Sequence, residues 1–252
     1  MQYKYASGQQ AYSDFASGRV FYSLPGHPAF PVRLASEIFQ RCVTQRKAIY
    51  NISSPCTIYD PCCGAAYHLS VLGYLHREEI QKVIASDIDE RAVALAERNL
   101  GLLQTDGLDK RIRELSEMFD QYGKASHQEA LHSASILKEK LSTLKEKHPI
   151  ATQVFQANVM DSQEISRQTP PRSVDIVFTD VPYGLHSQWR DVNLQEASNP
   201  LTSMLGSLLR ILSPSSIVAI ASDKQQKANH ERFQRLEQFQ VGKRRVVILR
   251  PL

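Results

Sequence analysis

Three aspartates in this sequence each come at the end of a hydrophobic run that has the composition of a β-strand. Asp60, Asp87 and Asp180 follow such a run directly. Open α/β sheets bind their ligands beyond the carboxyl ends of the strands, so acids in these positions are candidate ligand contacts. The pattern therefore predicts a site that is built from strand ends.

The segment after Asp60 reads Pro-Cys-Cys-Gly-Ala-Ala, a turn of small residues before a helical pattern. Small residues let a ligand approach the backbone N–H groups at the start of a helix, as in dinucleotide sites. The G-x-G-x-x-G pattern of those sites is missing, because only Gly64 stands at a glycine position. A carboxylate at Asp60 would repel a pyrophosphate but suits a ligand with an ammonium group. The segment favours S-adenosylmethionine over a nicotinamide dinucleotide, with Asp60, Cys62 and Gly64 at the cofactor.

Asp87 stands about one βαβ unit further along the chain, at the end of the next expected strand. A carboxylate there can accept hydrogen bonds from both hydroxyls of a ribose, and we expect Asp87 to do so. Asp89 is the competing acid. It directly precedes a helical pattern that begins at Glu90, so its better role is the N-cap of that helix.

The third acid opens the segment Asp180-Val181-Pro182-Tyr183. Pro182 stiffens the loop and removes a backbone donor, so that nearby carbonyls and the Asp180 carboxylate present acceptors toward one point. Such acceptors suit an N–H group, and the Tyr183 ring offers a face on which a flat base can stack. The segment predicts methyl transfer to a nitrogen of a planar amide or nucleobase. Its catalytic residues are Asp180, Pro182 and Tyr183, with Asp180 as general base.

The cysteines point to neither a metal site nor covalent catalysis. Cys42, Cys56, Cys62 and Cys63 form no pairs at zinc-binding spacing, so no metal is expected. Methylation of a pyrimidine carbon would need a thiolate nucleophile that faces the base. Cys62 belongs to the cofactor turn and the Asp180 loop contains no cysteine, so nitrogen methylation fits better.

Short β-rich runs alternate with helical patterns from residue 56 onward, which is typical of βαβ units and a parallel sheet. Helical patterns fall at Val32–Cys42, Glu90–Leu100 and Leu201–Leu212, the last before a Ser213-Pro214 stop. We expect an α/β protein with a Rossmann-like sheet that has helices on both faces. The expected strands are Cys56–Tyr59, Lys82–Ser86, Gln153–Gln156, Val174–Thr179, Ser216–Ala221 and Arg245–Arg250.

The connection between the second and third expected strands is too long for a simple crossover. Within it, apolar residues recur at helical spacing on both sides of Gly123, until Pro149. This pattern predicts a helical hairpin inserted near 101–149. The expected organisation is an N-terminal extension with a helix (1–50) that packs on a methyltransferase domain (51–252).

Two segments resemble motifs of the class I S-adenosylmethionine-dependent methyltransferases: Asp60-Pro61-Cys62-Cys63-Gly64 is similar to motif I, and Asp180-Val181-Pro182-Tyr183 to the N-P-P-Y-type motif IV. With Phe30–Glu37 and Val83–Asp87, they make most of the chain similar to the AviRa family of avilamycin-resistance rRNA methyltransferases. The resemblance implies a mostly parallel, seven-stranded fold and methylation of guanine N1 in 23S rRNA. It also implies protection of the large ribosomal subunit from an orthosomycin antibiotic.

Further site residues are implied by the resemblance, position by position. Phe30 and Arg33 match the segment that covers the methionine end of the cofactor. Asn158 and Val159 fall where such enzymes contact the adenine, although Asp161 competes with Asn158 for this role. The class usually has glycine at position 66, and Ala66 leads us to expect a backbone without positive φ there.

Contacts with RNA are expected in two places. The C-terminal part of the chain is rich in Lys and Arg, and Lys243, Arg244 and Arg245 are candidates for binding phosphates. His186 and Trp189 follow the catalytic loop and are candidates for contacting the substrate base. The target base has to be single-stranded or flipped out of its helix.

Composition narrows the partners and the location. A net charge of +4 and an isoelectric point near 8.8 are compatible with a polyanionic partner. No apolar run approaches the roughly 18 to 20 residues that span a bilayer, so no membrane contact is expected. We expect a cytoplasmic monomer that acts on 23S rRNA or the large ribosomal subunit. The alternatives are another N-methyltransferase, acting on DNA adenine or a protein amide, and a non-catalytic module that binds the cofactor or RNA.

Overall fold

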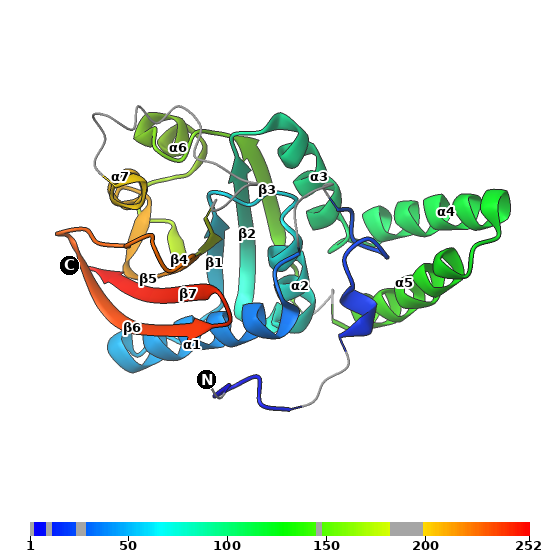
Figure 1. The fold of residues 1–252 in the computed structure, drawn as a ribbon, viewed down its shortest axis with the longest axis horizontal. Helices are drawn as coiled ribbons and strands as arrows, with labels where there is room; N and C mark the ends of the chain where they lie inside the picture. The colour runs from blue at the N-terminus through cyan, green and yellow to red at the C-terminus, as the bar shows by residue number, and fades with distance from the viewer. Residues whose placement is uncertain (1–2, 9–11, 24–28, 145–147, 182–198) are drawn as a thin grey trace.

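The computed structural model describes residues 3–8, 12–23, 29–144, 148–181 and 199–252. In these residues, seven strands form one sheet in the order β3-β2-β1-β4-β5-β7-β6 (Figure 1). β1 to β5 pair in parallel, and β7 runs antiparallel between β5 and β6. The predicted Rossmann-like, mostly parallel sheet is confirmed. The strands are β1 (Cys56–Asp60), β2 (Ile80–Asp87), β3 (Ala151–Gln156), β4 (Val174–Asp180), β5 (Leu212–Ser222), β6 (Phe233–Val241) and β7 (Arg244–Pro251).

Helices cover both faces of the sheet, because successive side chains of each strand point to opposite faces. Ile58 of β1 packs in the cluster that includes α1 and α2, whereas its neighbour Tyr59 packs in the cluster that includes α6 and α7. The helices are α1 (Val32–Tyr50), α2 (Tyr67–Leu75), α3 (Glu90–Gly101), α4 (Thr105–Tyr122), α5 (Ala125–Leu144), α6 (Ser162–Gln168) and α7 (Pro200–Leu208), with short 3-10 turns η1 (Ser13–Phe15) and η2 (Arg77–Glu79).

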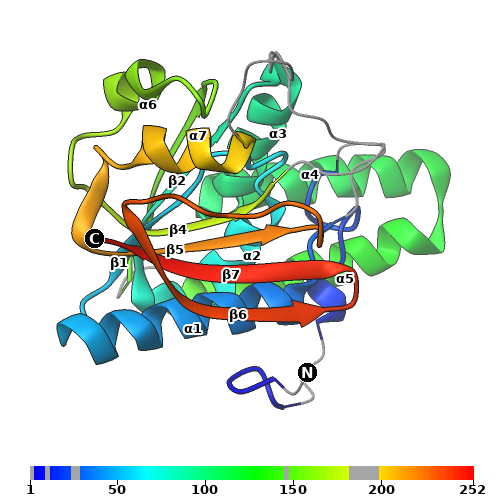
Figure 2. The same cartoon turned by 60° about the vertical axis from the view of Figure 1, so that its left-hand side comes forward.

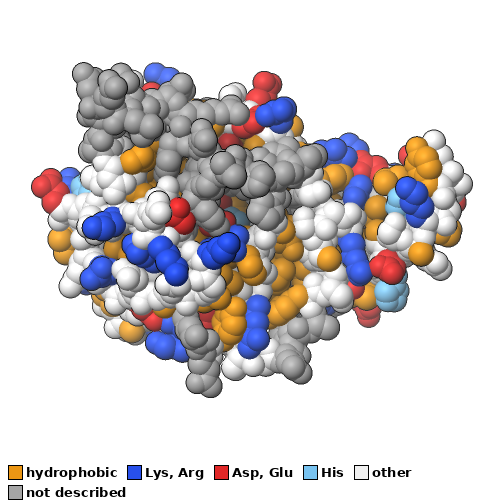
Figure 3. Space-filling model, in the orientation of Figure 1, with side chains coloured by type: hydrophobic (Ala, Val, Ile, Leu, Met, Phe, Trp, Pro, Cys, Tyr) orange, Lys and Arg blue, Asp and Glu red, His pale blue; other side chains and the backbone are white. Residues whose placement is uncertain are grey.

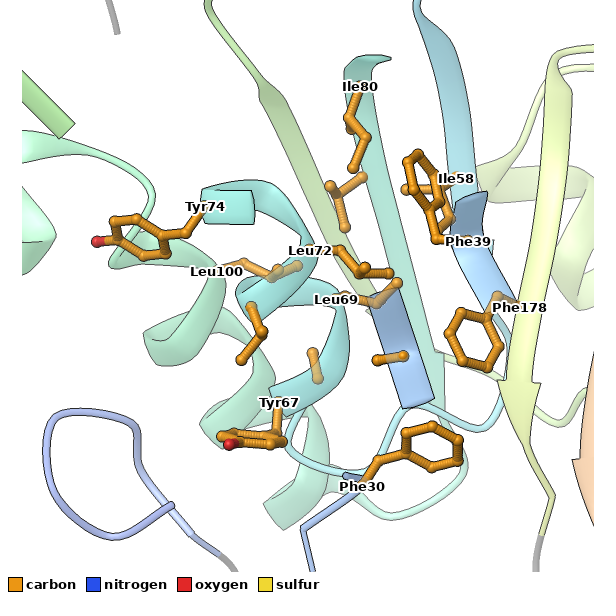
Figure 4. Close-up of a cluster of buried hydrophobic side chains, with 14 of the residues drawn as sticks. Phe30, Phe39, Ile58, Tyr67, Leu69, Leu72, Tyr74, Ile80, Leu100 and Phe178 are labelled. Atoms are coloured by element: carbon orange, nitrogen blue, oxygen red, sulfur yellow. The ribbon is translucent and has the colours of Figure 1, made fainter. Parts of the chain in front are cut away.

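The cluster on the α1 and α2 face fixes the start of α2 against β1. Figure 4 shows Leu69 and Leu72 of α2 close to Ile58 of β1, with Phe178 of β4 beside them. All four side chains are fully buried. Burying such a side chain contributes roughly 1.5 to 3 kcal/mol, so the packing holds the turn between β1 and α2 in place.

The region around β5 differs from the sequence expectation. α7 ends at Leu208 rather than Leu212, and β5 already begins at Leu212 and runs through the expected proline stop. Pro214 is tolerated because it is exposed and the pairing register between β4 and β5 shifts at this point. A bulge leaves proline with no ladder hydrogen bond to donate.

The sequence does not predict β6, which forms the edge of the sheet beside β7 (Figure 2). Most of its side chains are polar and lie at least partly outside the core. A strand of this kind lacks the hydrophobic run by which the other strands are recognised. β6 and β7 are joined by a tight turn at Gly242, which has a positive φ of 59°.

α4 and α5 form a helical hairpin in the predicted place between β2 and β3. The hairpin extends away from the sheet at the right of Figure 1. Leu108 and Leu115 of α4 and Leu137 of α5 are buried in it. The N-terminal segment packs against the hairpin, because Arg111 donates hydrogen bonds to the carbonyl oxygens of Arg19 and Val20.

Candidate functional site

The ends of β1, β2 and β4 bring Asp60, Asp87 and Asp180 to one edge of the sheet. β1 lies between β2 and β4, so Asp60 stands between the other two acids. Burial raises the pKa of Asp60 to about 8, and the charges on Asp87 and Asp180 add to this rise. Burial also raises the pKa of Asp87. Because the acids disfavour one another's ionisation, this edge favours a ligand that carries a positive charge.

Hydrogen bonds to the acids shape the turn after β1. Asp60 Oδ1 accepts from the Cys62 N–H at 3.0 Å, and Asp87 Oδ2 accepts from the Gly64 N–H at 2.8 Å. Asp87 Oδ1 accepts from the Asp89 N–H at 3.0 Å. Each carboxylate oxygen keeps a second lone pair for a ligand. The turn therefore sits directly against both acids, where a bound molecule would contact backbone and carboxylates together.

Ala66 departs from the sequence expectation. It has φ 51° and ψ 30°, a left-handed conformation, at the N-cap of α2, so the expectation of a backbone without positive φ is wrong. The surrounding hydrogen bonds impose this conformation: the Ala66 N–H donates to the Cys63 carbonyl, and the Ala66 carbonyl accepts from the Ser70 hydroxyl and N–H. Position 66 therefore has a left-handed backbone, which glycine adopts without strain.

His68 of α2 is a neighbour of Asp60 that sequence reasoning missed. Its Nε2 lies 3.3 Å from Asp60 Oδ2, and both side chains are almost fully buried. Burial lowers the pKa of His68 to about 4, so the ring is neutral at pH 7. Its only sequence signal is the helical periodicity that places position 68 on the first turn of α2.

Asp180 lies at the end of β4, where it meets Arg244 and a small aromatic cluster. Burial raises the pKa of Asp180 to about 7, against the lowering effect of Arg244, whose Nε lies 3.7 Å from Asp180 Oδ2. Asp180 Oδ1 is buried and has no hydrogen-bond partner in the part of the chain that the structure describes. The Phe30 ring packs edge-on against Phe178 (Figure 4), and the His68 ring lies next to both. A buried acceptor beside a ring edge can receive an N–H group of a planar ligand.

Comparisons with known proteins decide the family. A model of the family described as rRNA methyltransferase AviRa matches residues 1–244. The chain belongs to the AviRa family of rRNA methyltransferases. It is 38% identical over 248 residues to the 23S rRNA (guanine(2535)-N(1))-methyltransferase of Streptomyces viridochromogenes, covering 98% of this chain and 95% of that one. A solved structure of rRNA methyltransferase AviRa from the same organism superposes with a TM-score of 0.85 at 36% identity, covering 99% of this chain and 96% of that one.

Membership in the AviRa family makes the protein an enzyme of the methyltransferase class. The likeness extends over nearly the whole chain, so the hairpin α4–α5 and the edge strands β6 and β7 lie within the matched region. The predicted seven-stranded methyltransferase fold is therefore confirmed by both the sheet and the relatives.

Asn158 lies beside an open pocket of about 570 Å³ near the end of β3. Its N–H donates to Glu164 Oε2, and its side-chain oxygen accepts from the Met160 N–H. Val159 is buried in the core, and the competing Asp161 is occupied as the N-cap of α6. The pocket lies on the β2–β3 side of Asp87 and is lined by Ile88, Gln156, Ala157, Asn158, Glu164, Arg167 and Gln168.

Two other residues considered for the site, Arg33 and Asp89, form hydrogen bonds with other parts of the chain. Arg33 donates hydrogen bonds to the Ala6 and Ser7 carbonyl oxygens and lies over the Tyr3 ring, so it holds the N-terminal segment of the AviRa-family chain. Asp89 accepts from the Arg91 N–H as the N-cap of α3, which confirms the predicted capping role.

Lys243, Arg244 and Arg245, the predicted phosphate contacts near the C-terminus, have different surroundings in the structure. Figure 3 shows Lys and Arg side chains on the face that carries β6 and β7, and Lys243 is exposed in the turn between these strands. Arg245 donates to the Gln226 carbonyl. Arg244 instead reaches the Asp180 site, because β7 is antiparallel and starts where β4 and β5 end. Pro182, Tyr183, His186 and Trp189 lie outside the described residues.

Neither a metal cluster nor a membrane span occurs among the described residues. They contain no group of three or more His, Cys, Asp or Glu side chains that could hold a metal ion. No helix in this part of the chain is long and apolar enough to cross a membrane.

Proposed function

We propose that this protein methylates N1 of a guanine in 23S rRNA, with S-adenosylmethionine as the methyl donor. The observation that carries the proposal is Asp180, a partly buried acid with a buried Oδ1 and a raised pKa at the end of β4, in a chain whose AviRa-family relative is named for guanine N1 of 23S rRNA. Guanine N1 carries a proton that must leave before a methyl group can bind there. An acid with a pKa of about 7 is well matched to accept that proton near neutral pH.

The residues around Asp60 fit the methionine end of S-adenosylmethionine. Asp60 Oδ2 is buried and accepts no hydrogen bond within the described residues, which suits an ammonium group. In the proposal, Asp60, Cys62 and Gly64 hold this end and Phe30 covers it. Arg33, at the start of α1, belongs to the same covering segment as Phe30.

The ribose and adenine would lie along β2 and β3. Asp87 accepts hydrogen bonds from the two ribose hydroxyls with its remaining lone pairs, while Asn158, which lines the open pocket, and its neighbour Val159 border the adenine. When bound, S-adenosylmethionine supplies an electrophilic methyl group on its sulfonium. Substitution of the residues assigned here to the cofactor should weaken the binding of S-adenosylmethionine, which tests these assignments.

The catalytic loop acts on the base. Asp180 accepts the N1 proton, Pro182 keeps the loop rigid, and Tyr183 stacks against the guanine ring. The base enters from a single-stranded or flipped position, at a cost of about a few kcal/mol. His186 and Trp189 contact the base or its neighbours, while Lys243 and Arg245 contact RNA phosphates.

The test is to incubate the protein with methyl-labelled S-adenosylmethionine and unmodified 23S rRNA, as naked RNA and as large subunits, and to identify the labelled nucleoside by mass spectrometry. We expect N1-methylguanosine. Label on DNA adenine or on a protein amide instead would support another N-methyltransferase. Cofactor binding with no label on any substrate would support a non-catalytic module.

We further propose that the protein acts as a cytoplasmic monomer and that the modification protects the large subunit from an orthosomycin antibiotic. Expression in a sensitive bacterium should raise the inhibitory concentration of avilamycin, whereas an Asp180→Asn variant at equal abundance should not. An unchanged inhibitory concentration with complete rRNA methylation would contradict the protective role but leave the methyl transfer intact.

A further inference from the structure

Arg244 and Asp180 are adjacent in space although 64 positions separate them in the sequence. β7 runs antiparallel beside β5, so its first residue lies at the carboxyl end of the parallel strands. Arg244 Nε lies 3.7 Å from Asp180 Oδ2, and its guanidinium carbon lies 5.1 Å from the centre of the Phe30 ring. The Arg244 side chain is 21% exposed and that of Asp180 is 23% exposed, so both belong to the wall of the site rather than to the open surface.

The separation is an ion-pair distance but exceeds that of a hydrogen bond, so the two groups do not form a closed bidentate pair. Asp180 Oδ1 accepts no hydrogen bond in the described part of the chain and keeps its acceptor capacity. A guanidinium offers five N–H donors in a fixed plane, so one Arg can serve more than one acceptor. The site thus presents a carboxylate acceptor and a charged donor side by side.

This arrangement matches the Watson–Crick edge of guanine, where the N1–H donor stands beside the O6 acceptor. We propose that Arg244 donates a hydrogen bond to O6 of the target guanine and stabilises the negative charge that develops there as Asp180 takes the N1 proton. The inference rests on the proposed function and assigns it a second catalytic residue. Arg244 then touches the substrate base and is not a phosphate contact.

The proton and electrons balance in this step. The N1–H bond breaks and the proton moves to the Asp180 carboxylate, which leaves the electron pair of that bond on N1. The resulting anion is shared between N1 and O6, and the electron pair on N1 forms the new bond to the methyl carbon. The carbon–sulfur bond of S-adenosylmethionine breaks, and its electrons neutralise the sulfonium to a thioether.

Charged neighbours decide how much Arg244 contributes. Asp60 on β1 and Asp87 on β2 are acids along the same edge whose pKa values burial raises, and His68 on α2 is neutral at pH 7, so none of the three carries a positive charge. Burial disfavours ionised Asp180, and Arg244 is the group that opposes this effect. An anion on the base would therefore face mostly negative or neutral neighbours without Arg244. One charged donor aimed at a developing anion contributes about 10²- to 10³-fold in rate.

The experiment compares the full-length wild type with Arg244→Gln and Arg244→Lys on unmodified 23S rRNA, under single-turnover conditions from pH 5.5 to 9. We expect Arg244→Gln to lower the saturating rate about 100-fold or more and to move the acidic limb of the pH profile upward, with RNA affinity changed less than about threefold. Arg244→Lys should keep the position of the limb and recover part of the rate, because it retains the charge but not the planar fork.

The matched control is Arg210→Gln, an identical change at an exposed arginine that precedes β5 at the opposite edge of the sheet. It should leave rate and pH profile unchanged. Thermal unfolding and cofactor binding, measured by calorimetry for every variant, separate a local effect from misfolding. A rate within threefold of wild type, or a loss confined to salt-dependent RNA affinity, would overturn the inference. Absence of N1-methylguanosine from the wild type would instead refute the proposed function.

Discussion

His68 Nε2 and Asp60 Oδ2 lie 3.3 Å apart inside the protein, and neither atom has a hydrogen-bond partner among the described residues. A neutral histidine with a pKa of about 4 uses one ring nitrogen as donor, and the Phe178 backbone accepts a hydrogen bond from the ring. Nε2 is then an acceptor, which would repel an ionised carboxylate. Burial raises the pKa of Asp60 to about 8, so Asp60 is mostly protonated at pH 7 and this repulsion is relieved.

Cofactor affinity should therefore depend on pH. An ammonium group pairs with ionised Asp60, so binding should release a proton and strengthen as pH rises toward about 8. Above that, an α-amino group, whose usual pKa is about 7.7 to 8.0, loses its charge. We expect a bell-shaped affinity for S-adenosylmethionine with a maximum near pH 8, measured by calorimetry.

Asp60→Asn should weaken cofactor binding and remove the acidic limb of this bell, because the amide cannot ionise. Asp106→Asn, at an exposed acid in the first turn of α4, provides the control and should keep the wild-type profile. An affinity that is constant from pH 6 to 8 in the wild type would contradict the pairing of Asp60 with the cofactor.

The same aspartate makes stability depend on pH. Asp60 has a usual pKa of 3.8 and a folded pKa of about 8, so between these values the folded protein binds more protons than the unfolded chain. The contribution that the raised pKa of Asp60 makes to the free energy of unfolding is fully present below pH 3.8 and is lost as pH rises through about 8. We subtract the free energy of unfolding of Asp60→Asn from that of the wild type, both measured with urea. This difference should be smaller at pH 8.5 than at pH 5.5, by on the order of a few kcal/mol. A difference that grows with pH would reverse the sign and exclude the shift.

The sequence predicts that the three acids lie at strand ends, because each follows a hydrophobic strand. A strand that is buried on both faces is recognisable from its residues alone, and parallel strands end at one edge. Asp60, Asp87 and Asp180 could therefore be assigned to one edge of the sheet from the amino-acid sequence. The effect of these acids on one another's pKa could not be predicted from the sequence, since it depends on burial and on the strand order.

His68 and Arg244 show what the sequence leaves open. The role of His68 depends on how α2 packs against β1, and that of Arg244 on the direction of β7. In the sequence, a basic run beside a glycine turn indicates a solvent-exposed surface that binds RNA. Only the antiparallel pairing of β7 places Arg244, a member of this run, next to Asp180. β6 escapes prediction for a similar reason, because an edge strand needs few apolar residues.

Ala66→Gly should stabilise the protein. The left-handed conformation costs an alanine about 1 to 2 kcal/mol, and glycine avoids this cost while it gives up about 0.4 to 1 kcal/mol through the entropy of the unfolded chain. A gain of about 0.5 to 1 kcal/mol is expected in urea unfolding. Ala65→Gly is the matched control, since Ala65 has no positive φ, and it should destabilise. Equal losses in both variants would show that Ala66 is not strained.

Asp180→Asn should abolish most of the methyl transfer while cofactor binding stays intact. Asparagine keeps the shape of the side chain but cannot accept the N1 proton, so the single-turnover rate should fall about 10²- to 10⁴-fold. In the wild type the rate should rise with pH up to about 7 and then level off, because Asp180 must be ionised to act as a base. Rates are measured with methyl-labelled cofactor and 23S rRNA, and calorimetry checks cofactor affinity. Asp106→Asn again serves as the exposed control. If Asp180→Asn retained its rate, or lost cofactor binding to the same extent, Asp180 would not be the base, and proton removal would have to fall to another group or to water.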